Sequence, residues 1–263
     1  MKTLRSRDNP LIKQLIRLSG SSRERRISGS TLLDGEHLIQ AYAAASIEPF
    51  ELVAASETGM QRAAVAALLE GATARDKVII EDRLFAQISQ VVTPSGILAV
   101  IRTPAEPPLP QSIGEGLYLE GIQDPGNLGS ILRTALGAGL RDVYLSHGSV
   151  FAWSPKVIRA GMGAHFHLAI RENVELQELA GRAEGRLVAT QSGAATGLYE
   201  ADLQGKIIWM FGNEGAGLSP AARAMAGLDV AIPMAGYTES LNVAASVAIC
   251  LYEQLRQKRS APR

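Results

Sequence analysis

Two polar residues that could bind a hydroxyl group and an anion occur in EGIQDPGNLGSILRTALGAG, residues 120–139. The sequence Asp124-Pro125-Gly126-Asn127 is typical of a turn, and the helix after it is expected to begin near Leu128. Arg133 would then lie in the first or second turn of that helix. An arginine near a helix N-terminus, beside an asparagine in the preceding loop, forms a site for an anion and a hydroxyl group. The alternative is a simple helix cap at Asn127 and a solvated Arg133.

Two glycine-containing turns near the C-terminus could form a ligand pocket. Each follows a short apolar segment of buried-strand type, residues 207–211 (IIWMF) and residues 230–233 (VAIP). Ser219-Pro220 is expected to open the helix after the first turn, and Thr238 or Ser240 to cap the helix after the second. Pockets of parallel sheets lie at the carboxyl ends of the strands, so the sequence predicts that both turns line one pocket.

For several common kinds of active site, the sequence lacks a residue or pattern that the site requires. The loop from Gly212 to Ser219 has the glycine spacing of a P-loop, but Leu218 stands where the phosphate-binding lysine belongs. The same loop reads G-x-x-G-x-G and comes late in the chain, which disfavours a Rossmann dinucleotide site. His165 and His167 lie outside any cluster with metal-ligand spacing and are interpreted as ordinary polar positions. No G-x-S-x-G nucleophile elbow occurs.

Strand and helix patterns alternate along the chain and predict an α/β fold with a mainly parallel sheet covered on both faces. In the first part, strands are expected at residues 31–35, 50–56, 77–80 and 96–101, with helices from Asn9-Pro10 and at residues 36–45, 61–69 and 82–90. Residues 20–29 are polar and arginine-rich and are expected to form a mobile or RNA-facing connection. Four prolines between Thr103 and Ser112 predict a domain boundary.

The second part repeats the alternation up to the paired turns. Strands are expected at residues 116–122, 142–146, 166–170 and 186–190, and helices at residues 128–138, 155–161 and 176–184. A final helix carries apolar residues at spacings of three and four between Leu241 and Leu255. The candidate catalytic and ligand-binding residues therefore belong to this second part of the chain.

The charge of the 263-residue chain is zero overall but unevenly distributed. Residues 1–26 contain eight basic and two acidic residues, and residues 256–263 contain four basic and no acidic ones. Basic ends on a neutral body favour a polyanion such as RNA as partner, although solvated ends explain them equally well. The single cysteine, Cys250, excludes an intrachain disulfide and fits a reducing cytoplasm. No apolar run is long enough for a signal peptide or a membrane span.

Three segments together resemble the signature motifs of the SpoU (TrmH-type) RNA 2′-O-ribose methyltransferases of the SPOUT superfamily. They are DPGNLGSILRTA, FGNEGAGLS and IPMAGYTESLNVAASVAI, and SPKVIRAGMGAHF is similar to a segment between the first two motifs. The resemblance covers residues 114–257. Residues 35–42 (GEHLIQAY) and the alternation around them resemble the small α/β/α RNA-binding domain of many such enzymes. The domains expected are therefore residues 1–103 for RNA binding, a linker at 104–113, and residues 114–263 for catalysis.

The resemblance implies a deep trefoil knot in the C-terminal domain, a homodimer with the last helix in its interface, and S-adenosylmethionine as cofactor. It implies an acceptor site made of Asn127, Arg133, Glu214, Ser240 and Asn242. It implies a cofactor site made of Thr190, Gln191, Gly212, Asn213, Gly215, Gly217, Ile232, Pro233, Met234 and Leu241. Candidates for contacts with the RNA backbone are Lys13, Arg17, Arg23, Arg25 and Arg26.

The function expected from this resemblance is transfer of a methyl group to a ribose 2′-hydroxyl, most readily in ribosomal RNA because of the N-terminal domain. A tRNA methyltransferase is one alternative. The other is an RNA- or ribosome-binding protein that has lost catalysis, which the intact acceptor set disfavours. A nucleotide hydrolase is opposed by Leu218. No metal and no membrane association are expected.

Overall fold

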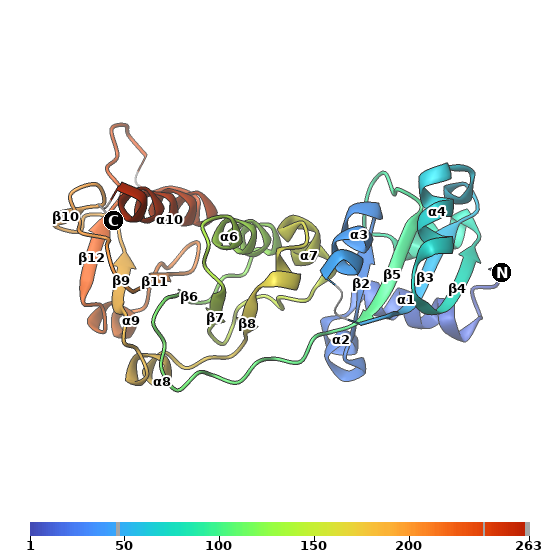
Figure 1. The fold of residues 1–263 in the computed structure, drawn as a ribbon, viewed down its shortest axis with the longest axis horizontal. Helices are drawn as coiled ribbons and strands as arrows, with labels where there is room; N and C mark the ends of the chain where they lie inside the picture. Colours follow the sequence, from blue (N-terminus) through green and yellow to red (C-terminus); the bar gives the residue numbers. More distant parts are fainter. Residues whose placement is uncertain (46–47, 239, 261–263) are drawn as a thin grey trace. The chain divides into compact units, whose positions relative to one another are not determined.

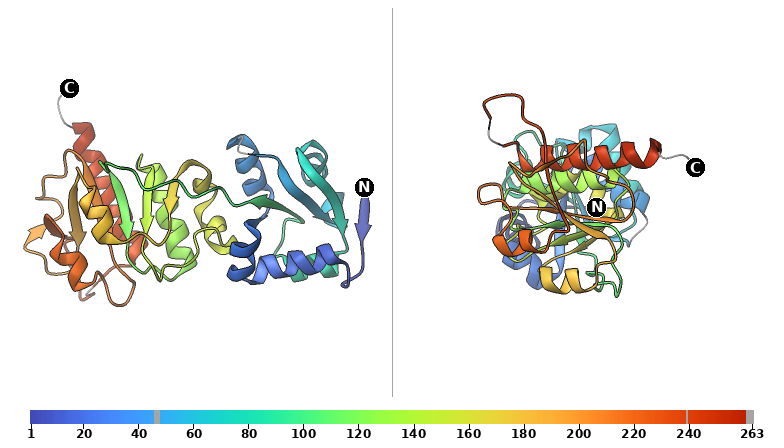
Figure 2. Two further views of the ribbon diagram at one scale, coloured as in Figure 1. Left: turned by 90° about the horizontal axis from the view of Figure 1, so that it is seen from below. Right: turned by 90° about the vertical axis from the view of Figure 1, so that its left-hand side faces the viewer.

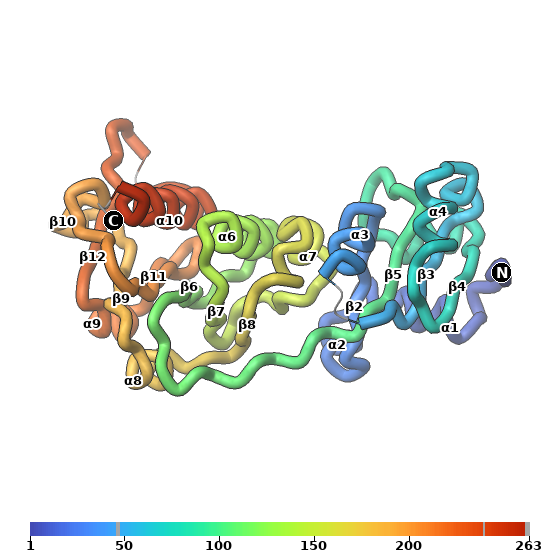
Figure 3. The backbone as a smooth tube through the Cα atoms, in the orientation of Figure 1, coloured from blue at the N-terminus to red at the C-terminus, as the bar shows by residue number. Residues whose placement is uncertain are grey.

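The computed structural model describes residues 1–45, 48–238 and 240–260. The chain forms two compact units, one of Met1–Ala105 with Trp153–Phe166 and the other of Glu106–Ala152 with His167–Arg263. Residues 103–112 contain no helix or strand and run as an extended connection (Figure 3). Glu239 of the third motif and Arg263 of the basic tail lie outside the described residues.

The first unit contains a five-stranded sheet of order β1-β4-β3-β5-β2 (Figure 1). Its strands are β1 (Lys2–Leu4), β2 (Ser30–Asp34), β3 (Phe50–Ser56), β4 (Ala74–Ile80) and β5 (Ile97–Arg102). β1, β4 and β3 are parallel, but β5 is antiparallel to both β3 and β2. Four of the strands therefore point in one direction and β5 alone runs against them, so the sheet of this unit is mixed. Helix α5 (Asp82–Ile88) lies between β4 and β5, and β5 begins at the edge of the sheet where β4 ends.

Two helices cover each face of this sheet (Figure 2). On one face α1 (Pro10–Gly20) and α5 pack their leucines and isoleucines against Leu32, Leu52 and Leu98. On the other lie α3 (Glu36–Ala45) and α4 (Ala63–Gly71), the latter preceded by a short 3₁₀ turn. α1 begins where the sequence predicts, since Asn9 Oδ1 accepts a hydrogen bond from the Leu11 amide at 2.9 Å and Pro10 occupies the first turn.

The arginine-rich residues predicted as a mobile connection form a helix instead, α2 (Ser22–Ser28). The Ser21 side chain caps its N-terminus, and Gly29 ends it in the left-handed region at a φ of 64°. The sequence does not predict this helix, because a helix of two turns with few apolar residues produces no apolar periodicity.

The second unit contains a seven-stranded sheet of order β10-β12-β9-β11-β6-β7-β8, and every strand pair in it is parallel. Its strands are β6 (Gly116–Leu119), β7 (Asp142–Leu145), β8 (Ala169–Arg171), β9 (Arg186–Thr190), β10 (Thr196–Gly197), β11 (Ile207–Phe211) and β12 (Leu228–Ala231). The central strands β6 and β11 are buried along their whole length, as expected for a parallel sheet covered on both faces. The predicted α/β class with a parallel C-terminal sheet is confirmed.

Helices α8 (Leu176–Gly181) and α9 (Pro220–Ala224) contribute to a core on one face, and α6 (Pro125–Gly137) packs with α10 (Val243–Ser260) on the other. α6 begins at Pro125, three residues earlier than predicted, because Asp124 Oδ1 accepts from the Asn127 amide and caps the helix. α10 begins after Asn242, whose side-chain oxygen accepts from the amides of Ala244 and Ala245, so neither Thr238 nor Ser240 is the cap.

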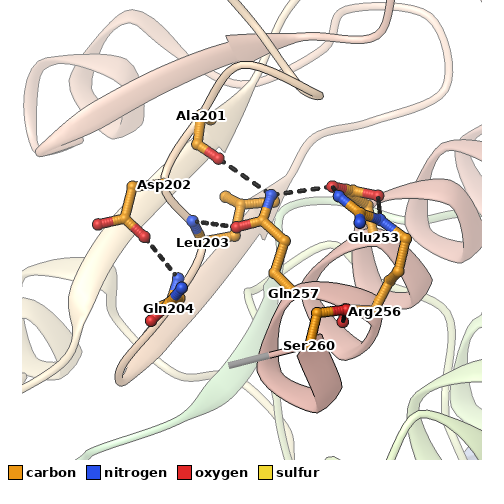
Figure 4. A network of polar contacts seen from close by, with 8 residues as sticks. All are labelled: Ala201, Asp202, Leu203, Gln204, Glu253, Arg256, Gln257 and Ser260. Carbon is orange, nitrogen blue, oxygen red and sulfur yellow. Dashed lines mark hydrogen bonds and ion pairs between the residues drawn. The ribbon is translucent and has the colours of Figure 1, made fainter. Parts of the chain in front are cut away.

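α10 is attached to the sheet and to the loop before β11 by two glutamines. Buried Gln254 accepts a hydrogen bond from the Trp209 indole at 2.7 Å. The Gln257 side chain accepts from the Leu203 amide at 2.9 Å and donates to the Ala201 carbonyl at 3.0 Å (Figure 4). Glu253, which is buried, accepts from both Gln257 and Arg256. These contacts fix the helix whose first turn follows Asn242.

One segment of the first unit comes from between β7 and β8 of the other sheet. It contains α7 (Pro155–Gly161), which has the predicted bounds and is capped by Ser154. The Thr31 hydroxyl on β2 donates to the Trp153 carbonyl at 2.7 Å, and both residues are buried. Phe166 packs edge-on against Tyr42 of α3, with ring centres 5.2 Å apart. These contacts explain why residues 153–166 belong to the first unit, whereas the sequence predicts them in the second domain.

Candidate active site

A cavity of about 640 Å³ lies where the loops after β6, β9, β11 and β12 meet. Because the strands are parallel, their carboxyl ends share one edge of the sheet. The cavity is lined by the following residues: Asn127, Thr190, Gln191, Ser192, Phe211, Gly212, Asn213, Glu214, Gly215, Ala216, Gly217, Leu218, Arg223, Val230, Ile232, Met234, Ser240, Leu241, Asn242, Val243 and Ser246. Both glycine-containing turns therefore face one pocket, as the sequence predicts.

The loop after β11 is closed tightly on itself. The Asn213 amide donates to the Gly217 carbonyl at 3.1 Å, and the Gly217 amide donates back to the Asn213 carbonyl at 2.9 Å. Gly217 has a φ of +68°, and a Cβ on Gly212 would lie 2.0 Å from the Gly217 carbonyl carbon. The side chain of Asn213 accepts from the amides of Gly215 and Ala216. Glycine is required at position 212 by this close approach and at 217 by the backbone conformation.

The end of this loop is joined to β6 by a carboxylate. Glu120, directly after β6, accepts from the Ser219 amide at 2.7 Å and from the Ser219 hydroxyl at 2.8 Å. The same hydroxyl accepts from the Ala222 amide and caps α9. The position of α9 at the pocket is therefore set by both β6 and the glycine loop.

Three polar side chains from distant parts of the sequence form a continuous hydrogen-bonded chain at the pocket. The Asn242 amide group donates to Asn127 Oδ1 at 2.9 Å, and Asn127 Nδ2 donates to Glu214 Oε1 at 3.1 Å. Since Asn242 Oδ1 accepts from the first amides of α10, its nitrogen must face Asn127. The arrangement fixes the orientation of both asparagine amides.

Glu214 is held as a carboxylate. In addition to Asn127, the backbone amides of Gln123 and Asp124 donate to it, at 3.2 and 3.1 Å, and Asn213 Nδ2 lies 3.4 Å away. Partial burial acts to raise the pKa of Glu214, but the hydrogen bonds from Asn127 and from the backbone outweigh it, so the pKa is lowered. A carboxylate with a lowered pKa and several donors is a weak base and a strong positioning group.

Arg133 does not line this pocket. It lies in the third turn of α6 because the helix begins at Pro125, and its position about 240° around the helix from Asn127 puts it on another side. The Arg133 side chain is exposed. The expectation that Arg133 and Asn127 form one corner in the first or second turn is therefore wrong within a single chain.

Nine of the ten predicted cofactor-binding residues line the cavity, and Pro233 does not. Ser240 lines it with the acceptor candidates Asn127, Glu214 and Asn242. The sequence motifs do not point to the other lining residues, which are Ser192, Phe211, Ala216, Leu218, Arg223, Val230, Val243 and Ser246. Most of them directly adjoin a predicted residue. Arg223, Val230 and Ser246 do not, and no sequence pattern shows which side of the short helix that carries Arg223 faces the cavity.

The comparisons with known proteins agree with this geometry. Residues 116–252 match the model of the SpoU rRNA Methylase family, and residues 9–99 match the MRM3-like substrate binding domain. The chain belongs to the SpoU rRNA methylase family. The first match includes the whole hydrogen-bonded chain from Asn127 to Asn242 and spans more than half of the sequence.

Relatives of this SpoU-family chain match it over nearly its whole length. An uncharacterized tRNA/rRNA methyltransferase of Synechocystis is 34% identical over 98% of this chain and 95% of its own. The 23S rRNA (guanosine(2553)-2′-O)-methyltransferase RlmP of Bacillus subtilis is 32% identical over 96% of this chain and 98% of its own. The crystal structure of the SpoU methyltransferase AviRb of Streptomyces viridochromogenes, in complex with AdoMet, superimposes with a TM-score of 0.86 at 25% identity, covering 97% and 100% of the two chains.

The basic residues of the SpoU-family chain's first unit differ in exposure. Lys13 and Arg17 lie on α1 and form exposed ion pairs with Asp8 and Glu24. Arg23 and Arg26 are exposed on α2. Arg25 is only 4% exposed and donates to the carbonyls of Leu18 and Ser19 at the end of α1, so the prediction that it contacts RNA is wrong.

A metal site and a membrane-spanning helix, neither of which the sequence predicts, were sought among the described residues. Within residues 1–45, 48–238 and 240–260, no group of three or more histidine, cysteine or acidic side chains could hold a metal ion. His165 is buried and its ring packs against Trp153. Among the helices of those same residues, none combines the length and apolar character needed to cross a membrane.

Cys250 is a buried free thiol whose pKa is raised to about 12 by burial.

Proposed function

We propose that this protein transfers a methyl group from S-adenosylmethionine to a ribose 2′-hydroxyl of ribosomal RNA. The observation that carries the proposal is the hydrogen-bonded chain of Asn242, Asn127 and Glu214 on a pocket built from the glycine loop. The names of RlmP and AviRb support the reaction and the cofactor, and the RlmP name supports ribosomal RNA as the substrate. Transfer RNA is the alternative substrate.

The residues that line the pocket fit the proposed cofactor. Ile232, Met234 and Leu241 offer apolar walls for an adenine ring, while Thr190 and Gln191 offer polar groups at the end of β9. When bound, S-adenosylmethionine supplies a methyl group that its sulfonium already activates. The protein therefore has to bind, align and exclude water, which this pocket of mostly uncharged side chains can do.

The acceptor hydroxyl would be oriented by the fixed amides of Asn127 and Asn242, with Ser240 beside them. Glu214 is assigned the role of holding Asn127 and the turn before α6, because its lowered pKa makes it a poor proton acceptor. The proton of the 2′-hydroxyl would then leave to water or to a phosphate oxygen of the RNA. Arginine keeps its own proton, so Arg133 would bind a phosphate and stabilise the developing alkoxide.

Arg133 requires a second copy of the chain to take this role. It is exposed and away from the pocket of its own chain, but it lies on α6, which packs with α10. We propose a homodimer in which the α6–α10 layer forms the interface and the Arg133 of each copy completes the partner's pocket. A deep trefoil knot in the C-terminal unit, which the family resemblance implies, is part of the same proposal.

RNA recognition is assigned to the first unit, which the substrate-binding match covers. Lys13, Arg17, Arg23 and Arg26 would contact phosphates, and bases and 2′-hydroxyls of a structured RNA would supply specificity. The cytoplasm is the proposed compartment, which the free thiol of Cys250 supports.

The test is transfer of a labelled methyl group to ribosomal RNA and, separately, to transfer RNA, both from cells that lack this enzyme. The expected result is one labelled ribose in ribosomal RNA, located by alkaline hydrolysis, which 2′-O-methylation blocks. Label only in transfer RNA would replace the substrate assignment. Cofactor binding without transfer to either RNA would favour an RNA-binding protein that has lost catalysis.

A further inference from the structure

Most arginines of the second unit already have a partner. Arg141, Arg171, Arg182, Arg186 and Arg256 each donate to a carbonyl or carboxylate oxygen. Among residues 1–45, 48–238 and 240–260, the side chains of Arg133, Arg223 and Arg259 of this unit form no hydrogen bond or ion pair. Of these three, only Arg223 lines the cavity, so its charge is available to a ligand there.

Arg223 is also the single cationic side chain among the described residues of the cavity wall, and Glu214 is the single carboxylate. Glu214 is already saturated by donors from Gln123, Asp124 and Asn127. The two charges consequently do not neutralise each other. A ligand that fills this cavity meets one positive group that the protein itself leaves unpaired.

The backbone that carries Arg223 is well positioned. Its amide donates to the Ser219 carbonyl at 3.0 Å, and Ser219 is bound through both its amide and its hydroxyl to Glu120. Glu120 continues β6, which lies next to β11 in the sheet. The backbone from which the Arg223 side chain extends is therefore joined to the centre of the sheet and fixed before a ligand binds.

We propose that Arg223 binds the α-carboxylate of the methionine part of the cofactor. This inference rests on the proposed function, and it assigns a role to a residue outside the three motifs. The carboxylate is the one anionic group of S-adenosylmethionine, and a guanidinium can donate two parallel hydrogen bonds to it. A phosphate of the RNA is the other anion that could reach a cationic side chain here. The cofactor is favoured because Arg223 shares the cavity wall with the adenine-type apolar residues.

The experiment measures the affinity of the full-length protein for two ligands by titration calorimetry. S-Adenosylhomocysteine contains the carboxylate and no sulfonium, and its decarboxylated analogue lacks only the carboxylate. For the wild type, removal of the carboxylate is expected to weaken binding about 10-fold or more. Arg223→Gln should weaken binding of S-adenosylhomocysteine by a similar factor and leave binding of the analogue nearly unchanged. Arg223→Lys should recover part of the loss through its charge.

Arg259→Gln is the matched control, because Arg259 is also exposed and unpaired but lies near the end of α10, outside the cavity wall. It should bind both ligands as the wild type does, and both variants should keep the wild-type melting temperature. The inference is overturned if Arg223→Gln binds S-adenosylhomocysteine as tightly as the wild type, or if it retains the full penalty for the missing carboxylate.

Two further outcomes separate this inference from the proposed function. Unchanged cofactor affinity in Arg223→Gln together with weaker binding of an RNA oligonucleotide would overturn the carboxylate assignment and transfer Arg223 to a phosphate. A wild-type protein with no affinity for S-adenosylhomocysteine would overturn the proposed function, and the assignment of Arg223 with it.

Discussion

Asn127 and Asn242, which are 115 positions apart in sequence, join their side-chain amides through a hydrogen bond of 2.9 Å. The bond connects the start of α6 to the start of α10, and Glu214 continues it into the glycine loop. Each of the three family motifs thus contributes one member. A site of this kind depends on the mutual orientation of its members, which leads to the first prediction.

Asn127→Ala and Asn242→Ala should each lower the methyl-transfer rate about 100-fold or more while changing the cofactor dissociation constant by only a few-fold. The reason is that both amides are assigned to the acceptor hydroxyl, and the walls for the cofactor remain. Single-turnover kinetics and calorimetry measure the two effects. The double variant should lose less than the product of the two single losses, because the residues act as a unit. Loss of cofactor binding in either single variant would refute this division of roles.

Glu214 should make the stability of the protein depend on pH in the acidic range. Its folded-state pKa lies below the ordinary value of 4.5, so its carboxylate stabilises the folded state above that value. As pH falls through the folded pKa, the unfolded chain takes up the proton first and the contribution is lost. The melting temperature of the wild type should therefore exceed that of Glu214→Gln at pH 7, and the difference should shrink as pH falls below 4.5. A difference that stays constant down to pH 3 would contradict the hydrogen-bonded carboxylate.

Mixed dimers test the role of Arg133. Arg133→Ala and Asn242→Ala should each be inactive alone. If Arg133 serves the partner's pocket, a mixed dimer has one pocket in which both residues are intact. If Arg133 serves the pocket of its own chain, neither pocket of a mixed dimer has both residues intact. Refolding the two variants together should therefore restore about a quarter of wild-type activity, since half of the dimers are mixed and each has one intact pocket. No recovery in a sample shown by mass to contain mixed dimers would assign Arg133 to its own chain.

The glycine loop offers a matched pair of substitutions. A Cβ at Gly212 would lie 2.0 Å from backbone atoms, whereas a Cβ at Gly215 would meet only Asn213 Oδ1, at 3.6 Å. Gly212→Ala should open the loop and weaken cofactor binding at least about 10-fold, while Gly215→Ala should stay within a few-fold of the wild type. Calorimetry with S-adenosylhomocysteine measures both. Equal affinities would mean that the loop tolerates displacement.

Arg25 and Arg23, neighbours on α2, should have opposite phenotypes. Arg25→Ala removes charged hydrogen bonds to the end of α1 and should lower the free energy of unfolding by about 1–3 kcal/mol in urea titrations. Arg23→Gln should change it by less than about 0.5 kcal/mol. In return, Arg23→Gln should weaken RNA binding and flatten its dependence on salt. An unchanged salt slope would remove Arg23 from the RNA contacts.

Much of the fold can be predicted from local sequence patterns. α1 and α7 begin at the prolines where the sequence predicts them, since such signals act over a few residues. The direction of β5 could not be predicted, because strand pairing is decided by tertiary contacts and both directions fit the same apolar run. The two-residue β10 has too little sequence to produce a pattern.

The parts of the site that glycines and the order of the motifs define could be predicted from the sequence. The roles of single arginines could not, because they depend on whether the side chain is buried, exposed or facing the cavity. Arg25 and Arg23 look alike in the sequence, yet only one reaches the carbonyls at the end of α1. Arg133 was placed wrongly because Asn127 lies inside α6 and not in the loop before it, so six helical residues separate the two side chains by about 240°. Arg223 was missed because no single-residue pattern reveals which side of a short helix faces a cavity.

The assignment of residues 153–166 to the first unit has a consequence for biosynthesis. When translation has produced only residues 1–105, the surface of β2 and α3 that receives Trp153 and Phe166 has no cover. The N-terminal unit can reach its final state only after about sixty further residues, including β6, α6 and β7, have left the ribosome. Maturation of the RNA-binding half is thereby tied to the elongation of the catalytic half, and a gene truncated at the proline-rich connection would encode an incomplete domain.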